Sequence, residues 1–164
     1  MKKCMVIASC ALLLLAAGCK KNSDNEPAAP QPQPVQPTTL YGTIEQPDWT
    51  ASSSYDLASS MTAVVSVDLK AQFPTLATDF VIDENDLLAA YAGDICMGVI
   101  DPDADLFFLY VAAPATGAPA VVTLRYYSAH YKNIFYAKDA FPFRNDTQLG
   151  TVNAPYSPTW IVAP

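Results

Sequence analysis

The feature that most constrains the fold is an alternation of apolar and polar residues over short segments. In 61–69, apolar side chains at the odd positions face one way and mostly polar ones at the even positions face the other. A period of two with β-branched residues indicates a half-buried strand. The segment 120–127 repeats the pattern, with Val122, Leu124 and Tyr126 on one side and Thr123 and Arg125 on the other. Two strands of this kind predict a sheet with one buried face.

Turn residues separate the remaining strand candidates, and Gly93-Asp94 joins 87–92 to 95–100 at hairpin spacing. The segment 106–111 is apolar throughout, which is typical of a central strand covered on both faces. Shorter strands are expected at 40–45, 134–137, 140–144 and 159–162, and Pro74 argues against a helix over 71–78. About eight strands with frequent turns predict an all-β, antiparallel, immunoglobulin-like β-sandwich.

The first nineteen residues predict the location of the protein. Met1-Lys2-Lys3 is cationic, 5–17 is apolar, and Gly18-Cys19 follows, which is the order of a lipoprotein signal peptide over 1–18. The apolar run is too short to span a ~30 Å hydrocarbon core. We expect acyl chains such as palmitate on Cys19 to anchor the mature protein in the outer membrane, at the cell surface. Because Ala16 stands where Leu is commonest, an ordinary signal peptide with an incidental cysteine remains the alternative.

The next segment predicts a tether. Residues 19–39 contain the lipidated cysteine and then five prolines with almost nothing apolar to bury. Such a chain stays extended at ~3 Å per residue, so the twenty residues 20–39 span up to ~60 Å. The β-sandwich domain is then expected over 40–164.

Composition limits the partners and the reactive groups that the domain over 40–164 can have. Residues 40–164 carry five basic and fourteen acidic side chains, a formal charge of −9, which argues against nucleic acid as a partner. Cys4 and Cys10 leave with the signal, so Cys96 stands alone and, within the apolar segment 95–100, is predicted to be a buried thiol. His130 has no accompanying nucleophile elbow, so we expect a loop or strand-end histidine and no catalytic residues.

Two acidic segments, 83–86 and 101–105, could hold calcium, but both are interpreted as polar turns. One histidine and one cysteine do not make a zinc site, and no cofactor or metal is predicted. Paired carboxylates for glycoside hydrolysis are left open by the sequence, without a cleft motif to support them.

Aromatic residues offer the most direct route to a ligand. Four are predicted to contact a glycan or protein on the surface: Trp49, Tyr127, Tyr131 and Trp160. Alternation places Tyr127 with Arg125 on the outward side, and Tyr131 falls in an expected loop. The alternative is that these rings fill or cover the core.

Several segments together resemble a module of surface and secreted proteins of Bacteroidetes. The run 86–98, DLLAAYAGDICMG, is similar to its D-x-x-A-A-F-x-x-x-x-C-R-G pattern, with Met97 in place of arginine. The strand candidates 106–111 and 122–127 resemble its Y-F-L-x-V and V-T-F-R-L-Y strands, and Gly150 with Pro155 its closing residues. Ser23 to Glu26 is similar to a surface-export signal, although Lys20 and Lys21 intervene. The resemblance implies a β-sandwich accessory or adhesion-like module without catalysis.

The sequence thus favours a non-enzymatic cell-envelope lipoprotein whose β-sandwich binds a glycan or protein. The alternative is a structural or assembly subunit of an outer-membrane or periplasmic complex, meeting its partner through the acidic surface. A small hydrolase is the least favoured hypothesis.

Overall fold

The computed structural model describes residues 37–52, 55–115 and 117–162, all within the unit Val35–Pro164. The predicted signal peptide 1–18, Cys19 and most of the tether lie outside the described residues. Within the described ranges, no helix has the length and apolar character needed to cross a membrane.

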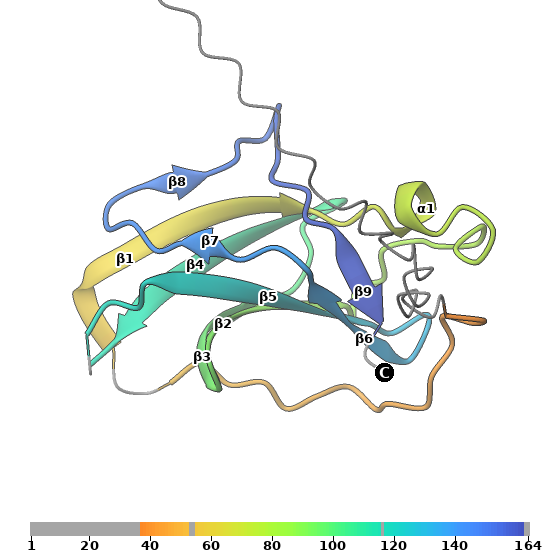
Figure 1. Cartoon of the computed structure of the whole chain (residues 1–164), viewed down its shortest axis with the longest axis horizontal. Helices are drawn as coiled ribbons and strands as arrows, with labels where there is room; N and C mark the ends of the chain where they lie inside the picture. The colour runs from red at the N-terminus through yellow and green to blue at the C-terminus, as the bar shows by residue number, and fades with distance from the viewer. Residues whose placement is uncertain (1–36, 53–54, 116, 163–164) are drawn as a thin grey trace, which may run out of the picture. The chain divides into compact units, whose positions relative to one another are not determined.

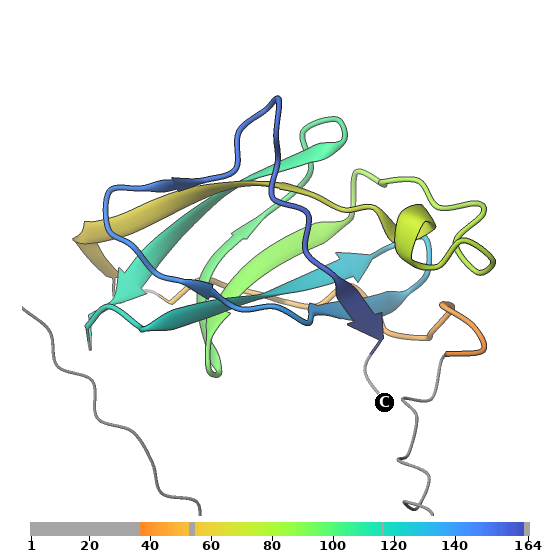
Figure 2. The same ribbon diagram turned by 45° about the horizontal axis from the view of Figure 1, so that its top comes forward.

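Two packed β-sheets form the domain (Figure 1 and Figure 2). One sheet has the order β4-β1-β8, and the other has the order β3-β2-β5-β6-β9, with β7 also pairing with β5. All pairs are antiparallel except β1 with β8. The strands are β1 Tyr55–Ser66, β2 Leu87–Ala92, β3 Ile95–Ile100, β4 Leu106–Pro114, β5 Val121–Ser128, β6 Asn133–Ala137, β7 Phe141–Pro142, β8 Gln148–Leu149 and β9 Trp160–Val162. The predicted all-β, antiparallel sandwich is confirmed.

The core lies between the sheets, on the faces that alternation assigns inward. In β1 the odd-numbered side chains from Met61 are buried, and in β5 Val122, Leu124 and Tyr126 are buried. The largest fully buried side chains of the core are aromatic, and Tyr126 contacts the rings of both Phe107 and Trp160 at centroid distances of 5.8 Å. Tyr126 also donates its hydroxyl to the fully buried carboxylate of Asp86.

The predicted turns are also confirmed. The hairpin of β2 and β3 has the expected bounds, and Gly93 has the positive φ of 59° that this turn requires. Between β3 and β4, Asp103 and Leu106 exchange backbone hydrogen bonds around Ala104, so the segment 101–105 is a tight turn. The segment 83–86 is likewise a turn, in which Asp86 points inward rather than to solvent.

Several local predictions are wrong. Strand β4 is not covered on both faces, since Phe108 is 44% and Tyr110 48% exposed. The segment 40–45 is not a strand, and the two-residue β8 was not predicted. Leu69 does not end β1 but begins the helix α1, Leu69–Gln72, because Asp68 accepts a hydrogen bond from the Ala71 amide and caps it. The helix ends before Pro74, as a proline inside it would break it.

Residues 40–52, here called the strap, run along the outer face of the sheet that contains β2 and β5, coloured orange in Figure 1. The Gly42 and Ile44 amides donate to the carbonyls of Tyr131 and Lys132 at 2.8 and 2.9 Å. At its other end the Ser52 amide donates to the Cys96 carbonyl at 3.0 Å. The strap therefore adds a partial third layer over one sheet.

Candidate ligand-binding site

Three of the four aromatic residues predicted on the surface are buried. The exposed fraction is 0% for Tyr131, 2% for Trp160 and 4% for Tyr127, so their surface placement is wrong. Trp49 is half-buried and remains accessible. The burial of the other three leaves Trp49 as the starting point for a site.

Each of the three has a different reason to be buried. Trp160 begins β9 and faces inward against Tyr126. Tyr131 stacks on Phe80 at 6.1 Å and donates its hydroxyl to Asp79 at 3.0 Å. Tyr127 does face outward, but the strap crosses it, and its hydroxyl donates to the Ile44 carbonyl at 3.3 Å. These rings hold the fold together rather than offering a surface.

Accessible polar and aromatic groups meet further along the same outer face. The guanidinium of Arg125, on β5, lies 3.7 Å from the ring centroid of Tyr91, on β2, and 5.7 Å from that of Tyr136, on β6. Strand register produces this grouping, since Arg125 pairs with Ala89 on one side and Tyr136 on the other. A guanidinium over an aromatic face is held by the ring's negative quadrupole.

The strap adds Trp49 to the group formed by Arg125, Tyr91 and Tyr136. The Trp49 ring meets Tyr91 edge to face, with centroids 6.2 Å apart and planes at 80°. Tyr91 is 6% exposed and forms the floor, whereas Trp49, Arg125 and Tyr136 are half-buried and reachable. We call Trp49, Tyr91, Arg125 and Tyr136 the aromatic–arginine face.

Arg125 is the only charge of this face. Burial raises the pKa of the Tyr91 phenol and of the neighbouring Cys96 thiol, so both stay neutral at physiological pH. Cys96 is buried and unpaired, as predicted. Within the part of the chain that the structure describes, the Arg125 guanidinium has no ion pair and no hydrogen bond. Its five N–H donors are thus available to a ligand.

A second cluster joins the strap to the domain. The Tyr41 hydroxyl donates to Asp79 at 2.6 Å, and His130 Nε2 lies 3.2 Å from the same carboxylate oxygen. Hydrogen bonds, the one from Tyr41 first, lower the pKa of Asp79 to about 2. We call Tyr41, Asp79, His130 and Tyr131 the latch. His130 lies in the turn after β5, and the same Nε2 also faces the Tyr41 hydroxyl at 3.3 Å.

This cluster does not have the geometry of a catalytic triad. A triad base uses one ring nitrogen for the nucleophile and the other for the orienting acid. In the latch a single nitrogen faces both partners, and the cluster holds the strap in place. Among the described residues, no three His, Cys, Asp or Glu side chains are grouped so as to hold a metal ion.

Sequence reasoning missed Tyr91, Arg125 and Tyr136 as members of a site. The alternation of β5 already placed Arg125 outward, which was the available signal. Their grouping depends on the register of β2, β5 and β6, which no local pattern reveals. Comparison with known proteins finds no matching family model, no matching curated protein and no matching solved structure.

Proposed function

We propose that the protein is a non-enzymatic lipoprotein of the cell envelope that presents its β-sandwich as a glycan-binding module. Cys19 would carry the lipid anchor in the outer membrane, and residues 20–39 would hold the domain away from the cell surface. The observation that carries the binding function is the half-buried Arg125, which lies near two tyrosine rings and has no ion pair among the described residues. Trp49 contacts Tyr91, one of these two rings.

The chemistry of this face suits a sugar. Aromatic rings bury the apolar face of a pyranose, and a fixed guanidinium donates hydrogen bonds to hydroxyl and ring oxygens. The formal charge of −9 over 40–164 disfavours polyanionic glycans, whose many charges would be repelled. A neutral glycan is therefore the preferred ligand.

Retention of the full chain on an array of neutral glycans tests the proposal. We expect Trp49→Ala and Tyr136→Ala to weaken retention about tenfold or more, because stacked aromatic anchors dominate small interfaces. Tyr110→Ala is the matched control, since Tyr110 is an exposed tyrosine on the other sheet. Equal retention by all three variants, or retention by no glycan, would contradict the proposal.

A second candidate function is a structural or assembly subunit of an envelope complex. Phe108 and Tyr110 favour it, since both rings are nearly half-exposed on the outer face of the sheet that contains β4. Exposed aromatic side chains are typical anchors of protein interfaces. Crosslinking on membranes should then recover a stoichiometric partner that Phe108→Ser removes, whereas repeated recovery of the chain alone would count against this function.

Protease added to intact cells tests the proposed location. Rapid loss of the protein while a periplasmic control survives is the result expected for the cell surface. Protection until the outer membrane is opened would instead favour the assembly function.

A further inference from the structure

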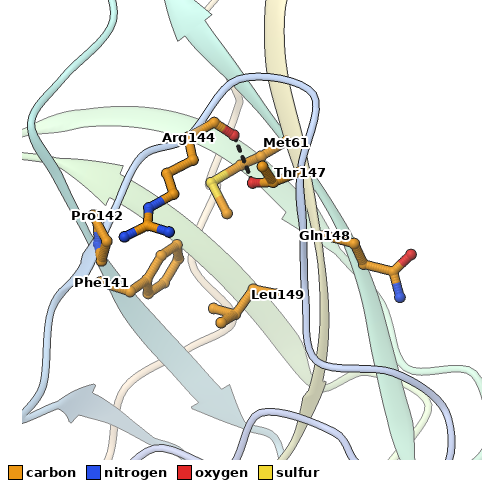
Figure 3. A pocket seen from close by; sticks show the side chains of 7 residues that line it. All are labelled: Met61, Phe141, Pro142, Arg144, Thr147, Gln148 and Leu149. Carbon is orange, nitrogen blue, oxygen red and sulfur yellow. Dashed lines mark hydrogen bonds between the residues drawn. The ribbon is translucent and has the colours of Figure 1, made fainter.

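A hollow of about 300 Å³ opens at the edge of the sandwich, between its two sheets (Figure 3). Met61 of β1 and Leu149 of β8 line it from one sheet, and Phe141 of β7 lines it from the other. Arg144 and Thr147 come from the loop between β7 and β8. The hollow shares no residue with the aromatic–arginine face.

Its floor is apolar and belongs to the edge of the core. Met61 is 4% and Phe141 5% exposed, and Leu149 is partly buried against the same core. Phe141 is held from behind by the Tyr156 ring, edge to face at 5.7 Å. A floor of this kind removes apolar ligand surface from water without a large rearrangement.

Of the polar side chains around the hollow, two are hydrogen-bonded to backbone carbonyls of described residues and a third is not. The Thr147 hydroxyl donates to the Arg144 carbonyl at 2.7 Å, and the Gln148 amide points away and donates to the Gly150 carbonyl at 2.8 Å. The Arg144 side chain reaches back over the hollow toward Phe141 (Figure 3). Among the described residues, its guanidinium has neither an ion pair nor a hydrogen bond. One unpaired cation therefore stands over an apolar floor.

From this geometry we infer that the hollow binds an amphipathic monocarboxylate, with its carboxylate on Arg144 and its apolar body against Met61, Phe141 and Leu149. A guanidinium forms two parallel hydrogen bonds with a carboxylate, the geometry for which it is best suited. At about 30 Å³ for each water-sized group, the volume holds a ligand of about ten non-hydrogen atoms. The formal charge of −9 over 40–164 opposes anion binding to the domain as a whole, so the attraction for a carboxylate at the hollow has to come from the nearby Arg144 guanidinium.

Methionine methyl NMR on the full chain, titrated with octanoate, tests this inference. Met61 lines the hollow, whereas Met97 is buried in the core and serves as an internal control. Met61→Leu and Met97→Leu assign the two signals. We expect the Met61 methyl signal to shift saturably with octanoate while the Met97 signal stays constant. Acetate, which lacks the apolar body, and 1-octanol, which lacks the carboxylate, should each bind more weakly.

Two charge variants complete the experiment. Arg144→Gln should weaken octanoate binding about tenfold or more, because a charge-assisted pair is lost. Lys138→Gln removes another exposed cation and should leave the affinity within about twofold, since exposed charges act weakly at a distance. An unchanged Met97 signal shows that each variant is folded. An unmoved Met61 signal, equal binding of octanol, or undiminished binding by Arg144→Gln would overturn the inference.

Discussion

The outer faces of the two sheets differ in what covers them, and two tyrosines show the effect. Tyr127 on β5 and Tyr110 on β4 both point away from the core, yet Tyr127 is 4% exposed and Tyr110 48%. The strap crosses Tyr127 and accepts its hydrogen bond, whereas no described segment crosses Tyr110 in this way. Alternation along a strand identifies its outward side chains but does not determine whether that side meets water.

The difference also separates the two candidate functions. On the strapped face, Trp49 and Arg125 both contact Tyr91 and belong to the candidate site. On the bare face, Phe108 and Tyr110 present apolar surface with no cation beside them in the described register. A defined polar and aromatic site suits a small ligand, whereas a bare aromatic strip suits a protein surface.

The largest expected effect is a difference in the free energy of unfolding between the alanine variants of Tyr127 and Tyr110. Tyr127→Ala should lower the free energy of unfolding by about 3 kcal/mol, because it leaves a cavity under the strap and an unpaired carbonyl at Ile44. Tyr110→Ala should lower it by less than about 1 kcal/mol, as expected for a half-exposed side chain. Urea denaturation of both variants measures the contrast. Equal losses would show that the strap does not bury Tyr127 in solution.

A smaller effect should follow from loosening the strap itself. A Cβ at Gly42 would lie 2.7 Å from the Lys132 carbonyl oxygen, so Gly42→Ala forces the strap outward. We expect a loss of about 1–3 kcal/mol, the usual range for overpacking at a close contact. Thr43→Ala, at the exposed neighbouring position, is the control for urea denaturation and should change little. If both variants unfold alike, the contact at Gly42 does not hold the strap.

The smallest effect concerns the latch and depends on pH. Asp79 has a folded pKa of about 2 against an ordinary 3.8, so its ionised form stabilises the folded state. That contribution is fully present above 3.8 and is lost as the pH falls toward 2. The stability difference between the wild type and Asp79→Asn should therefore shrink over this range in chemical denaturation. Asp139→Asn, at an exposed site outside the latch, provides the control, and a pH-independent difference for Asp79→Asn would contradict the prediction.

The buried carboxylate of Asp86 changes the folding stability with pH in the opposite direction to that of Asp79. Both contribute to the same measured pH profile. Burial raises its pKa, although Tyr126 and two backbone amides donate hydrogen bonds to it. A raised folded pKa means that the folded state gains relative stability as the pH falls through it. The total pH profile is thus the sum of two opposed carboxylates, which is why the comparison with Asp79→Asn is needed.

Most of the strands could be predicted because their signals are local. The hairpin at Gly93-Asp94, the turn at 101–105 and the inward residues of β5 follow from turn chemistry and a period of two. Strand β4 was misassigned because a continuous apolar run is compatible with an exposed face, as at Phe108. Strand β8 has two residues, too few for any period to appear.

For the candidate site, the placement of single residues could be predicted, but not which residues surround them. Tyr131 was expected in a loop, and the turn does place it there, but Phe80 and Asp79, about fifty positions earlier in the chain, enclose it. Arg125 was correctly assigned outward, yet its two tyrosine neighbours come from other strands. Such contacts arise from cross-strand register and cannot be read from one segment.

The sequence alone determined the all-β class, the positions of most turns, the acidic character of the domain and the isolation of Cys96. These follow from side-chain period, backbone preferences and charge, which act over a few residues. The tertiary structure decided which outward face the strap covers, and which aromatic residues are therefore buried. It also decided that the Arg125 guanidinium lies against two tyrosine rings and that the Arg144 guanidinium has no ion pair among the residues that the structure describes. Burial depends on distant segments packing together, and no local pattern contains that information.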